Sequence, residues 1–350
     1  MVIFISVQPL HALETSEDQI TAEVYLSYDY DYKTIMYSKN KDDLISPASI
    51  TKLMTALILY ENYPLNHTFI TKYPEFYEYS GKVAYIPEGL AITTEELLEL
   101  LLVYSANDAA YIVANCVFET YGEFILEMNN RSKELSMNST NFVNPDGLDE
   151  KDHITTANDL LNLSIYIIEN TKLLDITSKQ EIVFDELDKK NYKNTNTIID
   201  EGFIGLKTGW TSNAGLTFLG FNQKNDRKII TIVNKSVVDE NKKNHFNDTR
   251  ILYNQSIDNF DNVEILKNDQ EIFIIKSGFN TEVVRSNRTI YSFKNINDEK
   301  SIPKVSIVNN LFNITYSDIN KNTQIKINSI TKVDYKFNWS NKILNNIFNR

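Results

Sequence analysis

The stretch Ser46-Pro-Ala-Ser-Ile-Thr-Lys-Leu-Met-Thr55 sets a proline just ahead of residues 50–60, which carry a helical pattern of apolar side chains. Proline is favoured at a helix start, so we expect a helix to open here. Ser49 and Lys52 are three residues apart, and on a helix this spacing puts both side chains on one face. A serine hydroxyl is a poor nucleophile until a base takes its proton. The stretch therefore predicts a nucleophile, Ser49, with Lys52 as its base.

The Ser-x-x-Lys spacing has little weight by itself. It also occurs at Ser38, Ser301 and Ser329, and the last of these repeats the tetrapeptide Ser-Ile-Thr-Lys. We expect those three serines on strands or turns, where residues i and i+3 do not share a face. Only Ser49 opens a predicted helix, and this context separates it from the other three.

Two further short motifs follow along the chain. Ser105-Ala-Asn107 lies between two predicted helices, where a simple helix cap is the alternative interpretation. Lys207-Thr-Gly209 occurs once, within residues 202–220, which hold five of the ten glycines. Glycine gathers where the backbone turns tightly or lets another group approach. We therefore expect a hairpin beside a site here, with an exposed strand end as the alternative.

The remaining pattern predicts a chain of mixed helices and strands. Two strands joined by a turn are expected within residues 22–38. Thr93 and Glu96 have the capping-box spacing at the start of one helix, and Thr156 and Asp159 repeat it at another. Further strands are expected at residues 203–208, 216–221 and 228–234, and a run of short strands without helices at residues 263–333.

Composition limits the classes of function. The chain has 350 residues, of which 42% are hydrophobic and 23% charged, as in a soluble globular protein of roughly two domains. A formal net charge of −12 argues against nucleic acid as a partner. The four histidines and the single cysteine, Cys116, show no metal-ligand spacing, so neither a metal nor another cofactor is expected. Cys116 lies in an apolar run and is expected to be a packed core thiol.

The two ends of the chain have their own patterns. Residues 1–19 look like a truncated secretory signal, with apolar residues and a small Ala12 but no basic start. Residues 336–350 repeat apolar side chains at helical spacing, including Trp339 and Ile343, and carry positive charge without any acid. This pattern predicts a helix that makes peripheral contact with an anionic membrane surface. Packing on the β domain or on another subunit is the alternative.

Taken in order, Ser-x-x-Lys on a helix, Ser-x-Asn at a helix junction and Lys-Thr-Gly on a strand are the motifs of penicillin-recognising serine enzymes. The chain resembles the low-molecular-weight penicillin-binding proteins, the serine-type D-alanyl-D-alanine carboxypeptidases of peptidase family S11. The resemblance covers roughly residues 20–255. Besides Ser46 to Thr55, it rests on Tyr104-Ser-Ala-Asn-Asp-Ala109, Asn141-Phe-Val-Asn-Pro-Asp-Gly-Leu148 and Gly205-Leu-Lys-Thr-Gly-Trp-Thr-Ser212.

The resemblance implies an α+β fold in which an antiparallel sheet flanked by helices forms the transpeptidase-like domain, with a small all-β domain after it. We expect these domains at residues 20–257 and 262–334, followed by an amphipathic tail at residues 335–350. It also implies removal of the terminal D-alanine from peptidoglycan stem pentapeptides, inhibition by β-lactams, and a location in the cell envelope after export.

The resemblance further assigns roles to the motif residues. Ser49 forms the acyl-enzyme and Lys52 acts as base, while Ser105 relays a proton to the leaving amine and Asn107 orients Lys52. Lys207 is expected to lower the pKa of Lys52. The substrate-binding strand is expected to comprise Lys207 and Thr208, which hold the terminal carboxylate, together with Gly209 and Trp210. The oxyanion is expected between the backbone N–H groups of Ser49 and Trp210, and losing one such donor typically costs ~3 kcal/mol.

One departure and three competing functions accompany this interpretation. Where the family often has an arginine before a phenylalanine, this chain has His245-Phe246, which puts the grip on a free C-terminus in question. A DD-endopeptidase would use the same residues. A class A β-lactamase would need a deacylating glutamate, for which only Glu134-Leu-Ser-Met-Asn138 comes near. An inactive wall-binding protein would need no activated serine.

Overall fold

The computed structural model describes residues 19–184, 187, 190–224, 226–266, 271–277, 280–285, 290–296, 303–308, 311–317 and 324–331. The chain forms two compact units that divide between Asp258 and Asn259. Each unit is described by itself. The predicted signal segment and the predicted amphipathic tail lie outside the described residues.

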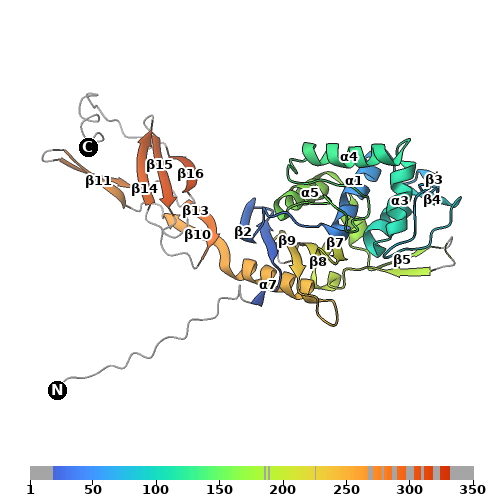
Figure 1. Cartoon of the computed structure of the whole chain (residues 1–350). Helices are drawn as coiled ribbons and strands as arrows, with labels where there is room; N and C mark the ends of the chain where they lie inside the picture. Colours follow the sequence, from blue (N-terminus) through green and yellow to red (C-terminus); the bar gives the residue numbers. More distant parts are fainter. Residues whose placement is uncertain are drawn as a thin grey trace, which may run out of the picture. The chain divides into compact units, whose positions relative to one another are not determined.

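A five-stranded antiparallel sheet is the centre of the first unit (Figure 1). The sheet confirms the strands expected from the sequence, with somewhat different ends. Its order places the first strands of the chain beside the last ones of the unit, so the sheet joins distant segments. The strands in order across the sheet are β2 (Thr34–Lys39), β1 (Val24–Asp29), β9 (Ile229–Ser236), β8 (Gly215–Asn222) and β7 (Phe203–Thr211).

Helices cover both faces of this sheet, as Figure 1 shows. One face packs on the main apolar core, to which Leu219 of β8 belongs. The neighbouring side chain, Phe218, points to the other face because successive residues of a strand alternate. There its ring lies 5.2 Å from that of Phe246 on α7. The helices are α1 (Lys52–Asn62), α2 (Thr94–Glu99), α3 (Asn107–Cys116), α4 (Tyr121–Glu134), α5 (Ala157–Asn170), α6 (Leu173–Thr177) and α7 (Asn244–Asn259).

The two helix starts expected from the capping-box spacing are confirmed, whereas Ser49 lies in a 3₁₀ turn and α1 begins at Lys52. The Thr93 side chain accepts a hydrogen bond from the Glu96 backbone, and Glu96 reaches back to the Thr93 backbone, so α2 has the full capping box. Thr156 accepts from the backbone of Asp159 at the start of α5. Helices α4, α6 and α7 are additions to the expected elements. The capping box of α4, formed by Thr120 and Glu123, was present in the sequence as a signal.

Two small hairpin-like pairs flank the helices of the first unit. They are β3 (Thr68–Ile70) with β4 (Ala91–Thr93) and β5 (Glu181–Phe184) with β6 (Lys190–Lys193). None of the helices that the structure describes is long and apolar enough to span a membrane.

The described part of the second unit consists of strands alone, which agrees with the small β domain expected there; its boundaries stay a prediction. All pairs are antiparallel. Ser329, which repeats the Ser-x-x-Lys spacing, lies on a strand of this unit and not on a helix. The strands are β10 (Phe260–Leu266), β11 (Glu271–Ser277), β12 (Asn280–Arg285), β13 (Ile290–Asn295), β14 (Pro303–Val308), β15 (Leu311–Ser317) and β16 (Gln324–Thr331).

Candidate active site

The predicted nucleophile and base lie where a short 3₁₀ turn, Ala48–Thr51, runs into α1. Ser49 is in the turn and Lys52 is the first residue of the helix. The Nζ atom of Lys52 donates a hydrogen bond to Ser49 Oγ at 3.0 Å. It also donates to Asn107 Oδ1 at 2.7 Å and to the carbonyl oxygen of Asp146 at 2.6 Å. The lysine ammonium has three donors, and these three acceptors use all of them.

The environment of Lys52 makes it suited to act as a base. Its side chain is wholly buried. Burial lowers the pKa of Lys52 to about 8, against the opposing charges of Asp146 and Asp108, and the positive charge of Lys82 lowers it further. A lysine in this range is deprotonated in an appreciable fraction near neutral pH, which general-base chemistry requires.

The cation that lowers the pKa of Lys52 is Lys82, a residue that sequence reasoning missed. The sequence predicts this effect for Lys207 instead. Lys207 is buried too, and its own pKa lies well below the usual range because of burial and the charges of Lys52 and Lys82. Lys82 carries no signal in the sequence, since it belongs to none of the motifs.

The Ser-Ala-Asn motif forms a second wall of the site. A π-helical turn, Leu100–Tyr104, ends at Ser105, which adopts a left-handed conformation with φ 71°. Asn107 then opens α3, and its side-chain Nδ2 donates to the carbonyl oxygen of Ser80 at 2.9 Å. With Oδ1 on Lys52 and Nδ2 on Ser80, both ends of the amide are held, so its orientation is fixed.

Strand β7 forms a third wall and lies close to the nucleophile turn. A Cβ on Gly209 would come within 2.9 Å of the Ala48 side chain and 3.0 Å of the Ser49 backbone nitrogen. Only glycine lets the strand approach this closely. The approach brings the strand's next residue, Trp210, beside the cavity that Ser49 lines.

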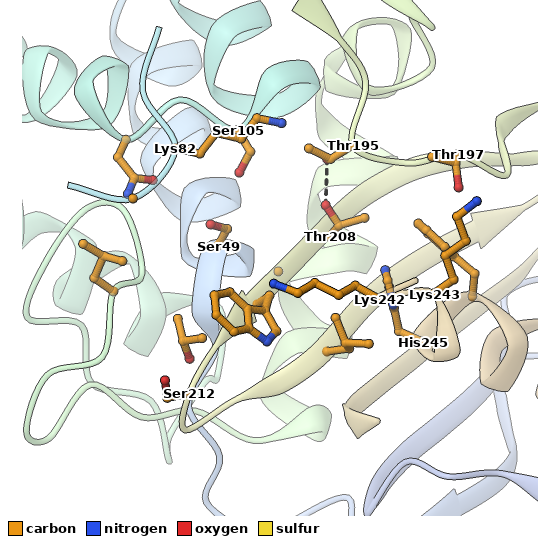
Figure 2. Close-up of a pocket in the computed structure, with 18 of the residues that line it drawn as sticks. Ser49, Lys82, Ser105, Thr195, Thr197, Thr208, Ser212, Lys242, Lys243 and His245 are labelled. Atoms are coloured by element: carbon orange, nitrogen blue, oxygen red, sulfur yellow. Dashed lines mark hydrogen bonds between the residues drawn. The ribbon is translucent and has the colours of Figure 1, made fainter. Parts of the chain in front are cut away.

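The other two residues of the Lys-Thr-Gly motif point in different directions. Thr208 Oγ1 donates to Thr195 Oγ1 at 2.7 Å, as Figure 2 shows, and Thr208 lines the cavity. The Lys207 side chain is only 2% exposed. Its Nζ donates to the carbonyl oxygen of Thr208 at 3.0 Å, so the ammonium lies behind the wall.

The segment of residues 144–148 closes the site from behind. The carbonyl oxygen of Pro145 accepts from Thr55 Oγ1 at 2.6 Å, next to the Asp146 carbonyl that accepts from Lys52. Gly147 has φ 87°, and a Cβ there would lie 1.9 Å from the carbonyl oxygen of Ala48. In the sequence the Asn-Pro-Asp-Gly stretch is only part of the family resemblance, and nothing there predicts that it packs against the nucleophile turn.

A buried histidine holds the same region, although no sequence motif marks it. His153 Nδ1 accepts a hydrogen bond from the Val143 backbone at 3.0 Å, so the proton sits on Nε2. This nitrogen lies 2.8 Å from Thr51 Oγ1 and donates to it. Burial lowers the pKa of His153 to about 4, and the ring is therefore neutral. The His153 ring therefore fixes the side chain of Thr51, the residue before Lys52.

A cavity of about 960 Å³ brings these walls together. Six of the eight predicted site residues line it, while Lys52 and Lys207 lie behind its walls. Its charged lining consists of one acid, Asp149, and three lysines, Lys82, Lys242 and Lys243. Figure 2 shows the labelled lining residues around the opening above Ser49. The six are Ser49, Ser105, Asn107, Thr208, Gly209 and Trp210.

His245, which stands where an arginine was expected, also lines the cavity. The side chain is 5% exposed, and burial lowers its pKa to about 4. His245 is therefore neutral at physiological pH and cannot act as a cation there. Within the described ranges, no group of three or more histidine, cysteine, aspartate or glutamate side chains is arranged to hold a metal ion.

A serine that shares a hydrogen bond with a buried lysine, at the wall of an open cavity, is the geometry of a serine acyl-transfer site. The chain matches the family model of the D-alanyl-D-alanine carboxypeptidases, peptidase S11, over residues 11–237. This match spans more than half of the chain. The protein belongs to the D-alanyl-D-alanine carboxypeptidase family.

Individual relatives agree with this membership. The chain is 29% identical over 227 residues to the D-alanyl-D-alanine carboxypeptidase DacF of Bacillus subtilis, covering 63% of this chain and 58% of the relative. It is 30% identical over 241 residues to the D-alanyl-D-alanine endopeptidase of Escherichia coli, covering 63% of this chain and 74% of that protein. The chain thus spans less than two thirds of the length of the carboxypeptidase relative.

Solved structures support the fold. Penicillin-binding protein D2 from Listeria monocytogenes, in a cefotaxime-bound form, has a TM-score of 0.61 at 28% identity, covering 68% of this chain and 98% of that one. Penicillin-binding protein 6B from Escherichia coli has a TM-score of 0.67 at 22% identity and covers 93% of this chain and 98% of that one. The α+β fold class expected from the sequence is therefore confirmed.

The charge of Lys82 leads to a pH prediction. Lys52 must be neutral to take a proton, so the rate of acylation by a β-lactam should rise with pH through about 8, the pKa of Lys52. Lys82→Met removes a positive charge that disfavours protonated Lys52, and the midpoint should move to higher pH. Lys82→Arg keeps the charge and should leave the midpoint in place. Stopped-flow acylation across pH measures this, and an unmoved or lower midpoint in Lys82→Met would contradict it.

The contact at Gly147 leads to a second prediction. Gly147→Ala puts a Cβ against the Ala48 carbonyl and must displace the nucleophile turn, so acylation should fall by about a hundredfold, as for a small misplacement of catalytic groups. Gly89→Ala is the matched control, because Gly89 has a similar φ of 82° but no atom within 4 Å of a built Cβ. Equal losses in the two variants would show that backbone strain alone is responsible.

Proposed function

We propose that this protein removes the terminal D-alanine from peptidoglycan stem pentapeptides through an acyl-enzyme on Ser49. The observation that carries the proposal is the 3.0 Å hydrogen bond between Lys52 Nζ and Ser49 Oγ at the edge of the cavity. The family membership adds the substrate class, since its model describes D-alanyl-D-alanine carboxypeptidases.

The proposed first step is acylation. Neutral Lys52 takes the proton of Ser49, and Ser49 Oγ attacks the carbonyl carbon of the penultimate D-alanine. The oxyanion accepts hydrogen bonds from the backbone N–H groups of Ser49 and Trp210. When this intermediate collapses, the C–N bond breaks, and Ser105 gives its proton to the leaving amine of the last D-alanine and takes in turn the proton that Lys52 accepted from Ser49. Fixed donors of this kind are a large source of transition-state stabilisation.

The second step is hydrolysis of the ester. A water molecule loses its proton to the base and attacks the acyl carbon, and the Ser49 oxygen leaves with a proton restored to it. Asn107 holds Lys52 in position for both steps through its 2.7 Å hydrogen bond. Lys207 and Thr208 are the partners of the terminal carboxylate that the sequence predicts. Thr208 lines the cavity, whereas Lys207 is buried behind its wall.

A DD-endopeptidase is the second candidate, because two kinds of relative match this chain. The Escherichia coli endopeptidase is as similar as the Bacillus subtilis carboxypeptidase. An endopeptidase would cut cross-links between stem peptides with the same nucleophile and base. Whether the protein acts as a carboxypeptidase or as an endopeptidase depends on how strongly the site binds a free C-terminal carboxylate.

A β-lactamase and an inactive wall-binding protein have weaker support. A class A β-lactamase would need Glu134 at the site. Instead Glu134 ends α4, is 64% exposed and pairs with Arg131 at 2.6 Å, and it does not line the cavity. Burying a lysine costs free energy of folding. A protein that only binds the cell wall would gain nothing from a buried lysine hydrogen-bonded to a serine.

The substrate also places the proposed activity in the cell envelope, where peptidoglycan is found. Export through residues 1–19 and peripheral membrane contact through residues 336–350 stay predictions. Stem peptides and β-lactams are the proposed ligands, with no nucleic acid and no cofactor expected.

Product analysis tests the proposal. A synthetic stem pentapeptide ending in D-Ala-D-Ala should lose one alanine by mass spectrometry, and benzylpenicillin should add one long-lived adduct per chain. Ser49→Ala should lose both reactions. Ser329→Ala, which changes the same tetrapeptide on strand β16, should keep both. An adduct on Ser49→Ala would reject the nucleophile, rapid penicillin turnover would favour a β-lactamase, and cleavage of cross-linked dimers alone would favour the endopeptidase.

A further inference from the structure

The proposed substrate ends in a carboxylate, and this charge needs a positive partner that reaches the cavity. Two candidates from the sequence do not reach it as cations. Lys207 is buried behind the wall and donates to the carbonyl oxygen of Thr208. His245 lines the cavity but is neutral, since burial lowers its pKa to about 4. A cation at the cavity surface must therefore come from another residue.

Lys242 lies at the cavity surface beside the substrate-binding strand. It lines the cavity, and its Nζ lies 4.1 Å from the centroid of the Trp210 ring. Trp210 follows Gly209, where an added Cβ would come within 3.0 Å of the Ser49 backbone nitrogen. The Lys242 ammonium therefore lies against a side chain of strand β7, the strand that passes beside Ser49. Figure 2 shows the Lys242 side chain extending across the pocket toward the side where Ser49 lies.

The backbone around Lys242 is tied down in a conformation that lysine disfavours. Its φ is 53°, in the left-handed region, and its N–H donates to the carbonyl oxygen of Asp239 at 3.0 Å. Asp239 Oδ1 also accepts from the backbones of Lys243 at 2.6 Å and Asn244 at 3.1 Å. These hydrogen bonds fix the loop that carries Lys242.

The Lys242 ammonium is free to exchange its present contact for an anion. Within the part of the chain that the structure describes, no carboxylate lies within ion-pair distance of it. Its contact with the half-exposed Trp210 ring is a cation–π interaction, worth about 0.5–1 kcal/mol at an exposed site. A charge-assisted hydrogen bond to a carboxylate is stronger.

The other two lysines of the cavity face different regions. Lys82 lies over the Tyr104 ring, 4.1 Å from its centroid, on the wall that carries Ser105. Lys243 is the neighbour of Lys242, but Figure 2 shows its side chain directed toward Thr197. Only Lys242 combines a place at the cavity surface with contact to the substrate-binding strand.

We propose that Lys242 binds the C-terminal carboxylate of the substrate and so makes the enzyme prefer peptides with a free C-terminus. The assignment rests on the proposed function, because it concerns the substrate of that reaction. The Lys242 ammonium moves away from the Trp210 ring and donates a hydrogen bond to the carboxylate in the cavity that Thr208 also lines. The positive charge thus comes from the loop before α7, three residues ahead of the neutral His245.

A pair of peptides tests this assignment. One ends in D-Ala-D-Ala with a free carboxylate, and the other is its C-terminal amide. In Lys242→Met, kcat/KM should fall about tenfold or more for the carboxylate peptide, as expected when a charge-assisted hydrogen bond is lost, and less than about twofold for the amide. Lys242→Arg should keep most of the preference. Lys243→Met, with the same charge change one residue away, should leave both values within about twofold.

The possible results separate the two proposals. Equal losses on both peptides in Lys242→Met, or an equal effect of Lys243→Met, would overturn the role of Lys242, because the effect would then come from structure or from the general field. Thermal unfolding of each variant identifies a loss of fold. A wild-type protein that cleaves neither peptide would overturn the proposed function, and the assignment of Lys242 with it. A carboxylate preference that survives in Lys242→Met would overturn the assignment alone.

Discussion

The ammonium of Lys52 is the point at which three segments of the chain meet. It donates to Ser49 on the nucleophile turn, to Asn107 at the start of α3 and to the backbone of Asp146. A charge buried without such partners would cost several kcal/mol. Even with these three partners, burial lowers the pKa of Lys52 to about 8. The loss of water around the ammonium, which destabilises the fold, is therefore also what allows Lys52 to act as a base. A second buried lysine, Lys207, adds to this cost and shows how far the site departs from a stable core.

The sequence predicted the parts of the fold and site that depend on local geometry. Ser49 and Lys52 are three residues apart at a predicted helix start. Although Ser49 lies in a 3₁₀ turn and not in α1, this local spacing still brings the two side chains together. The same holds for the capping box of Thr93 and Glu96 at the start of α2, which is set within four residues. The strands of the main sheet were likewise visible as alternating or apolar runs.

The parts that escaped prediction depend on contacts between distant segments. Lys82 comes near Lys52 through contacts between its loop and the start of α3: the Asn107 N–H donates to the Lys82 carbonyl oxygen at 2.7 Å, and Asp108 accepts from the Ala84 and Ile86 backbones. No spacing rule links these positions. Helix α7 packs on the second face of the sheet, and polar residues such as Asp248 and Thr249 are buried on it beside Phe246 and Leu252, so the apolar pattern of the helix is weak. The burial that lowers the pKa of His245 comes both from its neighbour Phe246, whose ring lies 3.9 Å away, and from Phe218 of the distant strand β8.

The order of strands in the main sheet also constrains how the protein can fold. Val24 on β1 pairs with Asn234 on β9, so the middle of the sheet joins the two ends of the first unit. On the ribosome, β1 emerges early and has no partner in the centre of the sheet until nearly the whole unit has been synthesised. Pairing of such distant segments slows folding, because a long loop must close before any contact rewards it. Until then only β2 is available to pair with β1, and the other edge of β1 stays open to a chaperone or to wrong pairing with another chain.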